Sequence, residues 1–294
     1  MCVLKEGRVH FKQMAIIGVG LIGGSLGLVA RRKRLVRSVI GYGKRRGELQ
    51  RAIAAGAIDR YFLSIQKTVS DADLVVLATP VGMFEKICRS MAPYLKEGTI
   101  VTDVGSVKGG WVEKIETLLP PHVAFVGGHP IAGREKSGIE SSAIELFEGH
   151  RCILTPTART SRPALKKMRA FWEAVGATIY EMDPVEHDRV MAAVSHLPHA
   201  AAYALMETLC HPDIAHDNPV RFSAGGLRDF TRIAASSPEM WRDIFLANGG
   251  NMIKVINRYI QTLEAMKKKI AAQDGAGLTT LFSRANVIRQ KAIL

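Results

Sequence analysis

The feature that most constrains this chain is a group of three glycines spaced G-x-G-x-x-G, between an apolar run and a helix-forming run in residues 14–25. In this spacing the first glycine allows a tight turn, the second lets the backbone approach a pyrophosphate, and the third lets the helix pack against the strand. The N–H groups that open such a helix have no partner within it and bind anions. The stretch therefore predicts a dinucleotide site, with a glycine-rich turn that binds no ligand as the alternative. The residues expected to contact the dinucleotide here are Gly18, Gly20, Leu21, Ile22 and Gly23.

Short apolar runs alternate with helical stretches through the first two thirds of the chain, which is the pattern of a parallel sheet covered on both faces. We expect strands at residues 14–17, 38–42, 72–78, 99–103, 124–126, 152–155 and 178–180, and helices near residues 48–55 and 163–175. The prediction is an α/β fold with a doubly wound Rossmann-type parallel sheet, in which ligands bind at the carboxyl ends of the strands. Thr79, Pro80 and Val104 follow two of these strands and are therefore expected to line the coenzyme site.

From Asp183 onward the apolar residues recur at helical spacing, and no strand is expected. Asp183 followed by Pro184 fits an N-cap and a first helical position. Pro198 requires the helix that contains it to kink or restart. A further long helix is expected over residues 252–269. We therefore predict a dinucleotide-binding domain over residues 1–182, whose first 13 residues form a loose extension, and an all-helical domain over residues 183–294.

Composition and charge limit the class of protein. Of the 294 residues 47% are hydrophobic, but no apolar run reaches the roughly 18 residues that span a bilayer, and the charged N-terminus does not fit a signal peptide. Four widely separated cysteines form no metal or redox pair and favour the reducing cytoplasm. The net charge of +13 is spread over several short basic runs without a nucleic-acid-binding motif, so we expect it to attract small polyanions rather than nucleic acid.

The choice of coenzyme is predicted from the end of the second strand, where an NAD site usually carries Asp or Glu for the ribose. Gly43 stands at this position, and Lys44 and Arg45 follow it. A missing carboxylate removes repulsion against the 2′-phosphate of NADP, and the cations can pair with that phosphate. We therefore expect NADP, or the use of both coenzymes. The alternative is a basic surface turn, with Glu48 or a peptide group serving the ribose of NAD.

His129 is the candidate for acid–base chemistry. It lies between Gly128 and Pro130, just past the strand expected at residues 124–126, and the proline restricts its backbone to extended geometry. Histidine can accept a proton from an alcohol near neutral pH. Ser106 follows the preceding strand and is expected to reach one ring nitrogen of His129, which would fix its tautomer. A structural or surface histidine is the alternative.

The helical half supplies candidates for binding an acidic substrate. Arg232 lies a few residues after a glycine pair, where a guanidinium can hold a carboxylate through two parallel hydrogen bonds. An ion pair with Asp229 is the alternative. His196 and His199 lie on either side of Pro198. No cysteine or acidic cluster accompanies these histidines, so no metal site is expected.

Six motifs together resemble prephenate dehydrogenase, and they occur in that family's order from Met14 to about Met252. The glycine motif is shared with many enzymes, whereas the other five are long and specific. The motifs are residues 18–24, Asp103-Val104-Gly105-Ser106-Val107-Lys108, Gly128-His129-Pro130-Ile131-Ala132-Gly133, Glu135-Lys136-Ser137-Gly138, Ser195-His196-Leu197-Pro198-His199 and Asp229-Phe230-Thr231-Arg232-Ile233-Ala234.

The resemblance implies oxidative decarboxylation of prephenate to 4-hydroxyphenylpyruvate in tyrosine biosynthesis, by a homodimer joined through the helical domain. It implies that His129 accepts the proton of the ring hydroxyl as hydride passes to the nicotinamide, that Ser106 hydrogen-bonds His129, and that Arg232 binds a substrate carboxylate. It implies neither a metal nor a covalent intermediate. The further substrate-site residues that it implies are His199, Ser236, His196 and Glu135, the last of these in a polar gate.

The chain departs from the family pattern at two positions. Arg134 replaces a small hydroxyl residue, where it either favours substrates with more carboxylates or points to solvent, and Gly43 replaces the common acidic residue. No room remains after Leu294 for the regulatory domain that some relatives carry, so any inhibition by tyrosine is expected to be competition in the active site. The alternatives to prephenate oxidation are oxidation of arogenate or of both substrates, a non-catalytic dinucleotide sensor, and a nucleic-acid binder.

Overall fold

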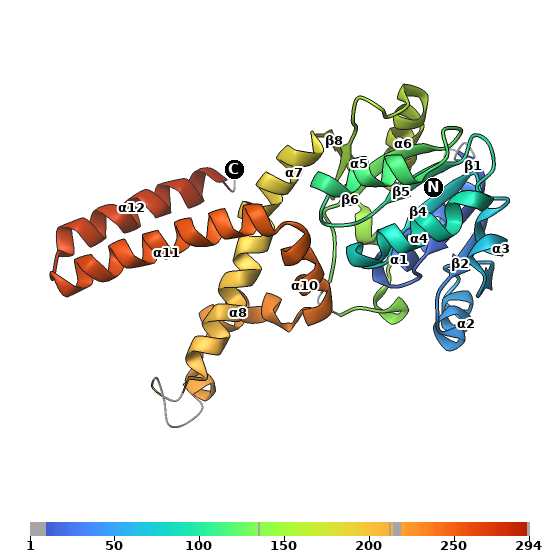
Figure 1. Ribbon diagram of the computed structural model, residues 1–294. Coiled ribbons are helices and arrows are strands. Elements are labelled where there is room, and N and C mark those ends of the chain that lie inside the picture. Colours follow the sequence, from blue (N-terminus) through green and yellow to red (C-terminus); the bar gives the residue numbers. More distant parts are fainter. Residues whose placement is uncertain (1–9, 135, 212, 214–218, 293–294) are drawn as a thin grey trace, which may run out of the picture. The chain divides into compact units, whose positions relative to one another are not determined.

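The computed structural model describes residues 10–134, 136–211, 213 and 219–292 (Figure 1). By their contacts the residues form two compact units, Met1–Asn248 and Gly249–Leu294. The first unit contains the sheet, the helices that cover it and helices α7 to α10, whereas the second contains α11 and α12. A domain boundary at residue 183 stays a prediction.

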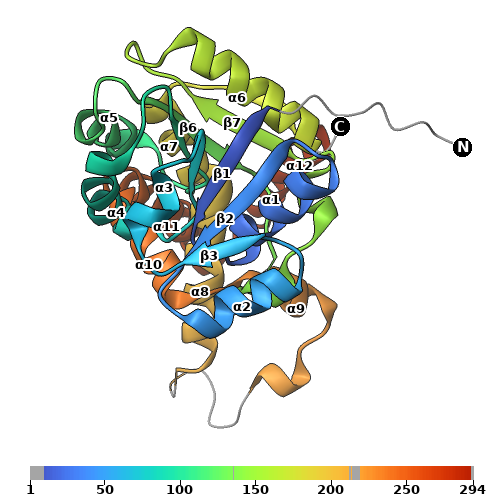
Figure 2. The same ribbon diagram turned by 90° about the vertical axis from the view of Figure 1, so that its right-hand side faces the viewer.

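An eight-stranded sheet organises the first unit (Figure 2), in the order β3-β2-β1-β4-β5-β6-β7-β8. β1 to β6 are parallel, and β1 lies between β2 and β4. Inner strands such as β4 are continuous apolar runs because helices cover both faces of the sheet. The doubly wound α/β fold is confirmed. The strands are β1 (Phe11–Ile17), β2 (Val36–Tyr42), β3 (Arg60–Phe62), β4 (Leu74–Leu77), β5 (Ile100–Asp103), β6 (Ala124–Pro130), β7 (Arg151–Thr155) and β8 (Thr178–Glu181).

Helices cover both faces of the sheet (Figure 2). They enclose two separate apolar cores, one on each face. α1, α2 and α6 pack on one face, where Leu26 and Trp172 are fully buried. α3, α4 and α5 pack on the other face, where Phe84 is fully buried. The faces are thereby closed, and the loops at the strand ends are left to form a site. The helices are α1 (Leu21–Arg32), α2 (Arg46–Ala54), α3 (Ile65–Val69), α4 (Phe84–Met91), α5 (Gly109–Leu118) and α6 (Arg162–Val175).

β1 begins earlier than the sequence predicts. Phe11 is buried, meets the ring of Phe171 edge to face, and pairs with Val36 of β2. Residues 11–13 therefore belong to the sheet and not to a loose extension, because burial of Phe11 fixes them. Residues 1–9 of the expected extension lie outside the described residues.

β7 and β8 run opposite to the other six strands, which the prediction of a parallel sheet did not include. The connection from β6 to β7 contains two short 3₁₀ turns, η3 (Ile139–Ser141) and η4 (Ile144–Phe147), which pack on α1. The described residues of this connection, 131–134 and 136–150, contain no helical crossover of the kind that usually joins parallel strands. α6 supplies such a crossover between β7 and β8, and that pair is parallel.

Helices α7 to α10 follow the sheet without a further strand in the described residues, as the sequence predicts. Asp183 caps α7 by accepting hydrogen bonds from the N–H groups of Val185 and Glu186. α7 passes into a π turn at Ala192–His196 before α8 starts, so the helix restarts just before Pro198. The elements are α7 (Pro184–Met191), α8 (Leu197–Leu209), α9 (Gly225–Thr231), η7 (Arg232–Ala235) and α10 (Pro238–Ala247).

The second unit consists of α11 (Gly249–Ala271) and α12 (Gly275–Ala292), which pack against each other. The predicted helix over residues 252–269 is part of α11, and Lys269 forms an ion pair with Asp274 in the turn between the two helices. In the described parts of both units, each helix is too short or too polar to cross a membrane. Location in the cytoplasm stays a prediction.

Candidate active site

The glycine turn after β1 has the geometry that a pyrophosphate needs. Gly18 has a φ of +101°, and a Cβ there would lie 2.6 Å from the carbonyl oxygen of Ala78, so only glycine fits. Gly20 caps α1 with its backbone alone, and a Cβ on it would meet no atom within 4 Å. The first turn of α1 contains no acidic residue. Open space without negative charge therefore lies at the start of α1, as an anion site requires.

The loop after β4 borders this turn. The methyl carbon of Thr79 lies 2.9 Å from the position that a Cβ on Gly18 would occupy, and the Thr79 hydroxyl is buried without a hydrogen-bond partner among the described residues. Pro80 is exposed beside it, and the N–H of Val104 bonds to a carbonyl at the end of β4. A buried hydroxyl without a partner fits a polar ligand on the glycine turn. The contacts of Thr79, Pro80 and Val104 with a coenzyme stay predictions.

The end of β2 is dominated by positive charge. Gly43 directly follows this strand, so no carboxylate stands at the predicted ribose position. Arg45 is the N-cap of α2 and pairs with Glu48 at 2.6 Å. The carboxylate of Glu48 is thereby paired with a cation, and the neighbouring cations Lys44 and Arg46 are exposed to solvent. The net positive charge at this position suits the 2′-phosphate of NADP.

The sequence predicted that His129 lies just past the end of a strand. In the structure it lies inside β6. β6 extends to Pro130 because β7 pairs with this part of it, and His129 is opposite Ile153. The imidazole of His129 is 9% exposed, and its Nδ1 lies 2.8 Å from Nε2 of His187 on α7. The ring is therefore held between the sheet and α7.

His187 continues this contact to a carboxylate. Its Nδ1 lies 2.9 Å from Oδ1 of Asp188. Asp188 also accepts the N–H groups of Lys108 at 2.7 Å and Gly109 at 2.8 Å, where α5 begins. A Cβ on Gly109 would lie 2.6 Å from Oδ2 of Asp188, so this close approach requires glycine. One carboxylate thus joins α5, α7 and, through His187, the ring of His129.

Lys108 contributes a buried cation next to this chain of bonds. Its Nζ donates to Oδ2 of Asp103 at 2.5 Å and to the carbonyl oxygen of Gly105 at 2.6 Å. The side chains of Lys108 and Asp103 are 1% and 2% exposed. Asp103 in turn accepts the N–H groups of Gly105 and Gly128. These bonds fix the loop that carries Ser106 against β6.

Ser106 is half-buried in this loop. The hydrogen bonds of the described residues include none between Ser106 and His129, and the Nδ1 of His129 meets His187. A bond from Ser106 can therefore form only at Nε2 of His129, where it would have to give way to the substrate hydroxyl, and it stays a prediction.

Burial keeps the imidazoles of this site neutral. Desolvation lowers the pKa of His129 well below its usual value, and the neighbouring titratable groups His187, Lys108 and His196 lower it further. Burial also lowers the pKa of His187, against the opposing effect of Asp188. A neutral imidazole has a lone pair, so His129 can act as a base at neutral pH.

His196 and His199 gather around Trp241. The Nδ1 of His196 lies 3.2 Å from the amide nitrogen of Asn248, its Nε2 has no partner among the described residues, and burial lowers its pKa to about 4. The ring of His199 stacks on Trp241 with centroids 3.7 Å apart. Asn248 also donates to the carbonyl oxygen of Asp188 at 2.8 Å. A chain of contacts therefore links both histidines to the backbone of Asp188, whose side chain contacts His187.

The residues predicted to bind the acid groups of the substrate are more exposed. Arg232 begins η7, which packs on α8, and its side chain is exposed. Ser236 is half-buried, and its carbonyl oxygen accepts the hydroxyl of Tyr203 at 3.0 Å. Arg134 is exposed and donates to a backbone carbonyl in its own loop at 3.3 Å. Glu135 lies outside the described residues. Contacts of these residues with a substrate stay predictions.

Several residues of the candidate site were not predicted from the sequence. The sequence did contain two signals. Lys108 ends the motif that follows β5, and the pair His187-Asp188 lies one turn after the N-cap of α7. Neither signal shows what these side chains contact, because the bonds join residues 58 and 80 positions apart. The missed residues are Lys108, His187, Asp188, Asn248 and Trp241.

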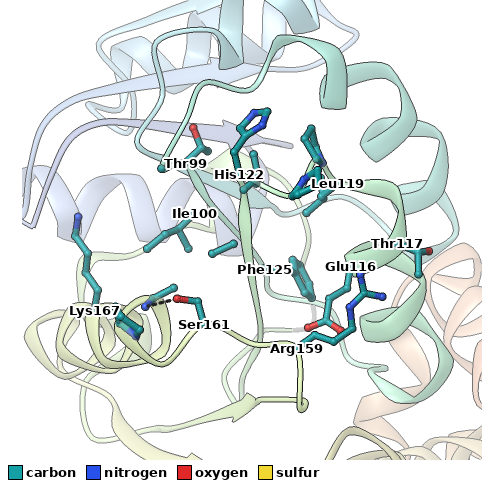
Figure 3. A pocket seen from close by; sticks show the side chains of 17 residues that line it. Thr99, Ile100, Glu116, Thr117, Leu119, His122, Phe125, Arg159, Ser161 and Lys167 are labelled. Carbon is teal, nitrogen blue, oxygen red and sulfur yellow. Dashed lines mark hydrogen bonds between the residues drawn. The ribbon is translucent and has the colours of Figure 1, made fainter.

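A cavity of about 730 Å³ lies elsewhere on the first unit (Figure 3). Thr99 and Ile100 line it at the amino-terminal end of β5, and Arg159 and Lys167 line it near the start of α6. It contains none of the predicted site residues. Because doubly wound sheets bind ligands at the carboxyl ends of their strands, this cavity is separate from the candidate active site.

Two family models match the chain: prephenate dehydrogenase, nucleotide-binding domain, at residues 26–181, and prephenate dehydrogenase, dimerization domain, at residues 183–284. A cyclohexadienyl dehydrogenase of Zymomonas mobilis is 38% identical over 280 residues, which is 95% of each chain. A prephenate dehydrogenase of Bacillus subtilis is 34% identical over 93% of this chain and 74% of its own. The solved structure of Aquifex aeolicus prephenate dehydrogenase with hydroxyphenyl propionate and NAD+ has a TM-score of 0.89 at 39% identity, covering 95% of this chain and 98% of that chain.

Proposed function

This chain belongs to the prephenate dehydrogenase family, and from that membership we propose that it converts prephenate to 4-hydroxyphenylpyruvate and carbon dioxide in tyrosine biosynthesis. It is an NAD(P)-dependent oxidoreductase of this family. The observation that carries the proposal is the buried, neutral imidazole of His129. It lies at the carboxyl end of β6, on the same edge of the parallel sheet as the glycine turn after β1.

In the proposed reaction His129 takes the proton of the ring hydroxyl on its Nε2. The nicotinamide of a bound coenzyme supplies the hydride acceptor for the hydrogen on the same carbon. Once that carbon is a carbonyl, the ring carboxylate leaves as carbon dioxide. Its bonding electrons complete the aromatic ring, and the carbonyl oxygen takes back the proton from His129 to become the hydroxyl of 4-hydroxyphenylpyruvate. The protein contributes a neutral base, orientation and complementary charge.

We propose that residues of the helical part of the first unit bind the carboxylates of the substrate. Arg232 binds one carboxylate, and His199 and Ser236 line the same pocket. His196 supports this assignment, because its Nδ1 accepts from Asn248 and its buried Nε2–H is then a donor without a partner among the described residues. Arg134 is proposed as a further cation for the carboxylates of the substrate, and Glu135 as part of a polar gate by resemblance to the family.

For the coenzyme we propose NADP or use of both dinucleotides. Gly43 in place of a carboxylate, together with the exposed cations Lys44 and Arg46, supports binding of a 2′-phosphate. The measurement is the ratio of kcat/KM for NADP to that for NAD. A ratio far below one would contradict the proposal.

Further features of the family are proposed for this chain. Oxidation of arogenate as well as prephenate is the alternative that the name of the Zymomonas mobilis relative supports. A homodimer is supported by the match of residues 183–284 and by apolar side chains exposed on α11 and α12, such as Leu263 and Phe282. We propose that tyrosine inhibits by competition, so that it raises the apparent KM for prephenate without lowering the maximal rate.

The test is direct. Purified protein is mixed with prephenate or arogenate and with NAD or NADP, and reduction of the coenzyme is followed by absorbance. We expect turnover with prephenate, and release of carbon dioxide in equal amount to the reduced coenzyme. Absence of turnover with both substrates and both coenzymes would reject the proposed function.

A further inference from the structure

The hydrogen bonds around His129 determine which of its ring nitrogens carries the proton. We infer that His187 and Asp188 are positioning residues, which hold the proton of His129 on Nδ1 and so leave the lone pair of Nε2 free as the base. The value of this arrangement for catalysis rests on the proposed role of His129 in prephenate oxidation. The assignment of the proton itself rests on the hydrogen-bond geometry and on the burial of both rings.

The carboxylate of Asp188 decides the position of the first proton. It accepts the N–H groups of Lys108 and Gly109 at 2.7 and 2.8 Å, at the start of α5. Two such donors and the positive end of the helix dipole stabilise the ionised form, and an ionised carboxylate can only accept. The Nδ1 of His187, 2.9 Å from Oδ1 of Asp188, must therefore carry a proton and donate it.

The next bond follows from the first. A neutral His187 has one ring proton, and because this proton lies on Nδ1, its Nε2 accepts. The Nδ1 of His129, 2.8 Å from that Nε2, must then be the donor. A neutral His129 with its proton on Nδ1 has its lone pair on Nε2. The reverse direction would set a lone pair of His187 against the charged oxygen of Asp188.

The surroundings keep both rings in the neutral state that this argument requires. Burial lowers the pKa of His129 and of His187. The charged or titratable groups that face His129 are His187, Lys108 and His196, and those that face His187 are Asp188, Lys108 and Asp103. When His129 takes a proton, the negative charge of Asp188, transmitted through the oriented ring of His187, stabilises the imidazolium.

The benefit of this arrangement is a base that is ready in every molecule. Either nitrogen of a neutral imidazole can carry the proton, and the partner of one nitrogen decides the state of the other. Without an acceptor at Nδ1, part of the protein would hold the proton on Nε2 and be unable to take one from the substrate. In a serine protease, loss of the carboxylate that fixes the histidine tautomer costs about 10⁴ in kcat.

The first experiment compares His187→Leu with His187→Gln. Leucine cannot accept the Nδ1–H of His129, so kcat should fall about a hundredfold or more, with the KM for the coenzyme unchanged. Glutamine can accept it through the amide oxygen, so kcat should fall less than about tenfold. Met191→Leu, one turn further along α7 and buried, is the packing control and should keep kcat within about twofold. Equal loss of kcat in the leucine and glutamine variants, or none in the leucine variant, would overturn the inference.

The second experiment observes the tautomer directly in the coenzyme-free protein by ¹⁵N NMR of labelled histidine. His129→Asn identifies the signals of His129 among the nine histidines. We expect a protonated Nδ1 and an unprotonated Nε2 in the unaltered protein, and a mixture in His187→Leu. A protonated Nε2 in the unaltered protein would reject the inference even if prephenate is oxidised. A protonated Nδ1 without any turnover would instead reject the proposed function and leave the proton assignment standing.

Discussion

Replacing Lys108 by methionine should destabilise the first unit, because the charge of Asp103 would stay buried without its cation. The two side chains are 1% and 2% exposed, so water cannot take the place of the ammonium group. Removing one partner of such a buried pair costs about 3 to 5 kcal/mol. Asp103 keeps the N–H groups of Gly105 and Gly128, so we expect the lower end, about 3 kcal/mol, or roughly a hundredfold larger unfolded fraction.

The assay is unfolding in urea followed by tryptophan fluorescence. All three tryptophans of the chain, Trp111, Trp172 and Trp241, lie in the first unit, so the signal reports on that unit. The matched control is Lys96→Met, which removes the same group from a pair with Asp73 where the lysine is 40% exposed. Solvent screens that pair, and its loss should cost at most about 1 kcal/mol.

Equal unfolding midpoints for the two methionine variants would refute the reasoning, since burial would then make no difference to the worth of the pair. The double variant Asp103→Asn with Lys108→Met provides a second check. It leaves no unpaired charge, so it should be more stable than Lys108→Met alone. A double variant that is less stable would show that the charge of Asp103 is satisfied by its backbone donors.

Four further outcomes are expected. His129→Asn should lower kcat about a hundredfold or more while coenzyme binding, measured by fluorescence titration, is kept; an unaltered kcat would remove His129 from the role of base. Arg232→Gln should raise the KM for prephenate up to roughly fivefold, because an exposed ion pair contributes at most about 1 kcal/mol. An unaltered KM would show that another cation, such as Arg134, binds the carboxylate. Because burial lowers the pKa of His129 from 6.5, kcat/KM should fall on the acid side only below pH 6.5, and a fall that begins at higher pH would contradict a buried neutral base. Burial lowers the pKa of His196 to about 4, so between pH 6.5 and 4 this histidine binds more protons in the unfolded chain than in the folded protein. The free energy of unfolding should therefore decrease as the pH falls through this range. His196→Gln should make the free energy of unfolding less dependent on pH, and an unchanged dependence would contradict the role given to His196.

Local chemistry made much of the fold predictable. The glycine turn specifies strand, turn and helix within a few residues, and Asp183 with Pro184 marks the start of α7 because both act on the backbone next to them. β3 was missed because it has only three residues at the edge of the sheet. The end of β6 was missed because Gly127, Gly128 and Pro130 weigh against a strand, and only pairing with β7 extends it.

The candidate site was predictable only for residues that carry a motif. His129 stands in a distinctive sequence, but its partner His187 stands in an ordinary helical one. The bond between them depends on how α7 packs near the end of β6, and that packing is decided by the whole first unit. The reversed strands β7 and β8 were unpredictable for a related reason, since their direction depends on the path of the loop that precedes β7 and not on their own residues.

The π turn at Ala192–His196 sets the rotational phase of α8. Such a turn holds one residue more than an α turn, so each side chain beyond it is displaced by about 100° around the axis relative to an unbroken α-helix. Removing a single residue there would return the backbone to regular geometry and swing His199 away from the ring of Trp241. The number of residues in this turn therefore determines the position of His199 as much as the identity of any residue in the turn does. In a variant shortened by one residue, the imidazole of His199 would lie in a different position.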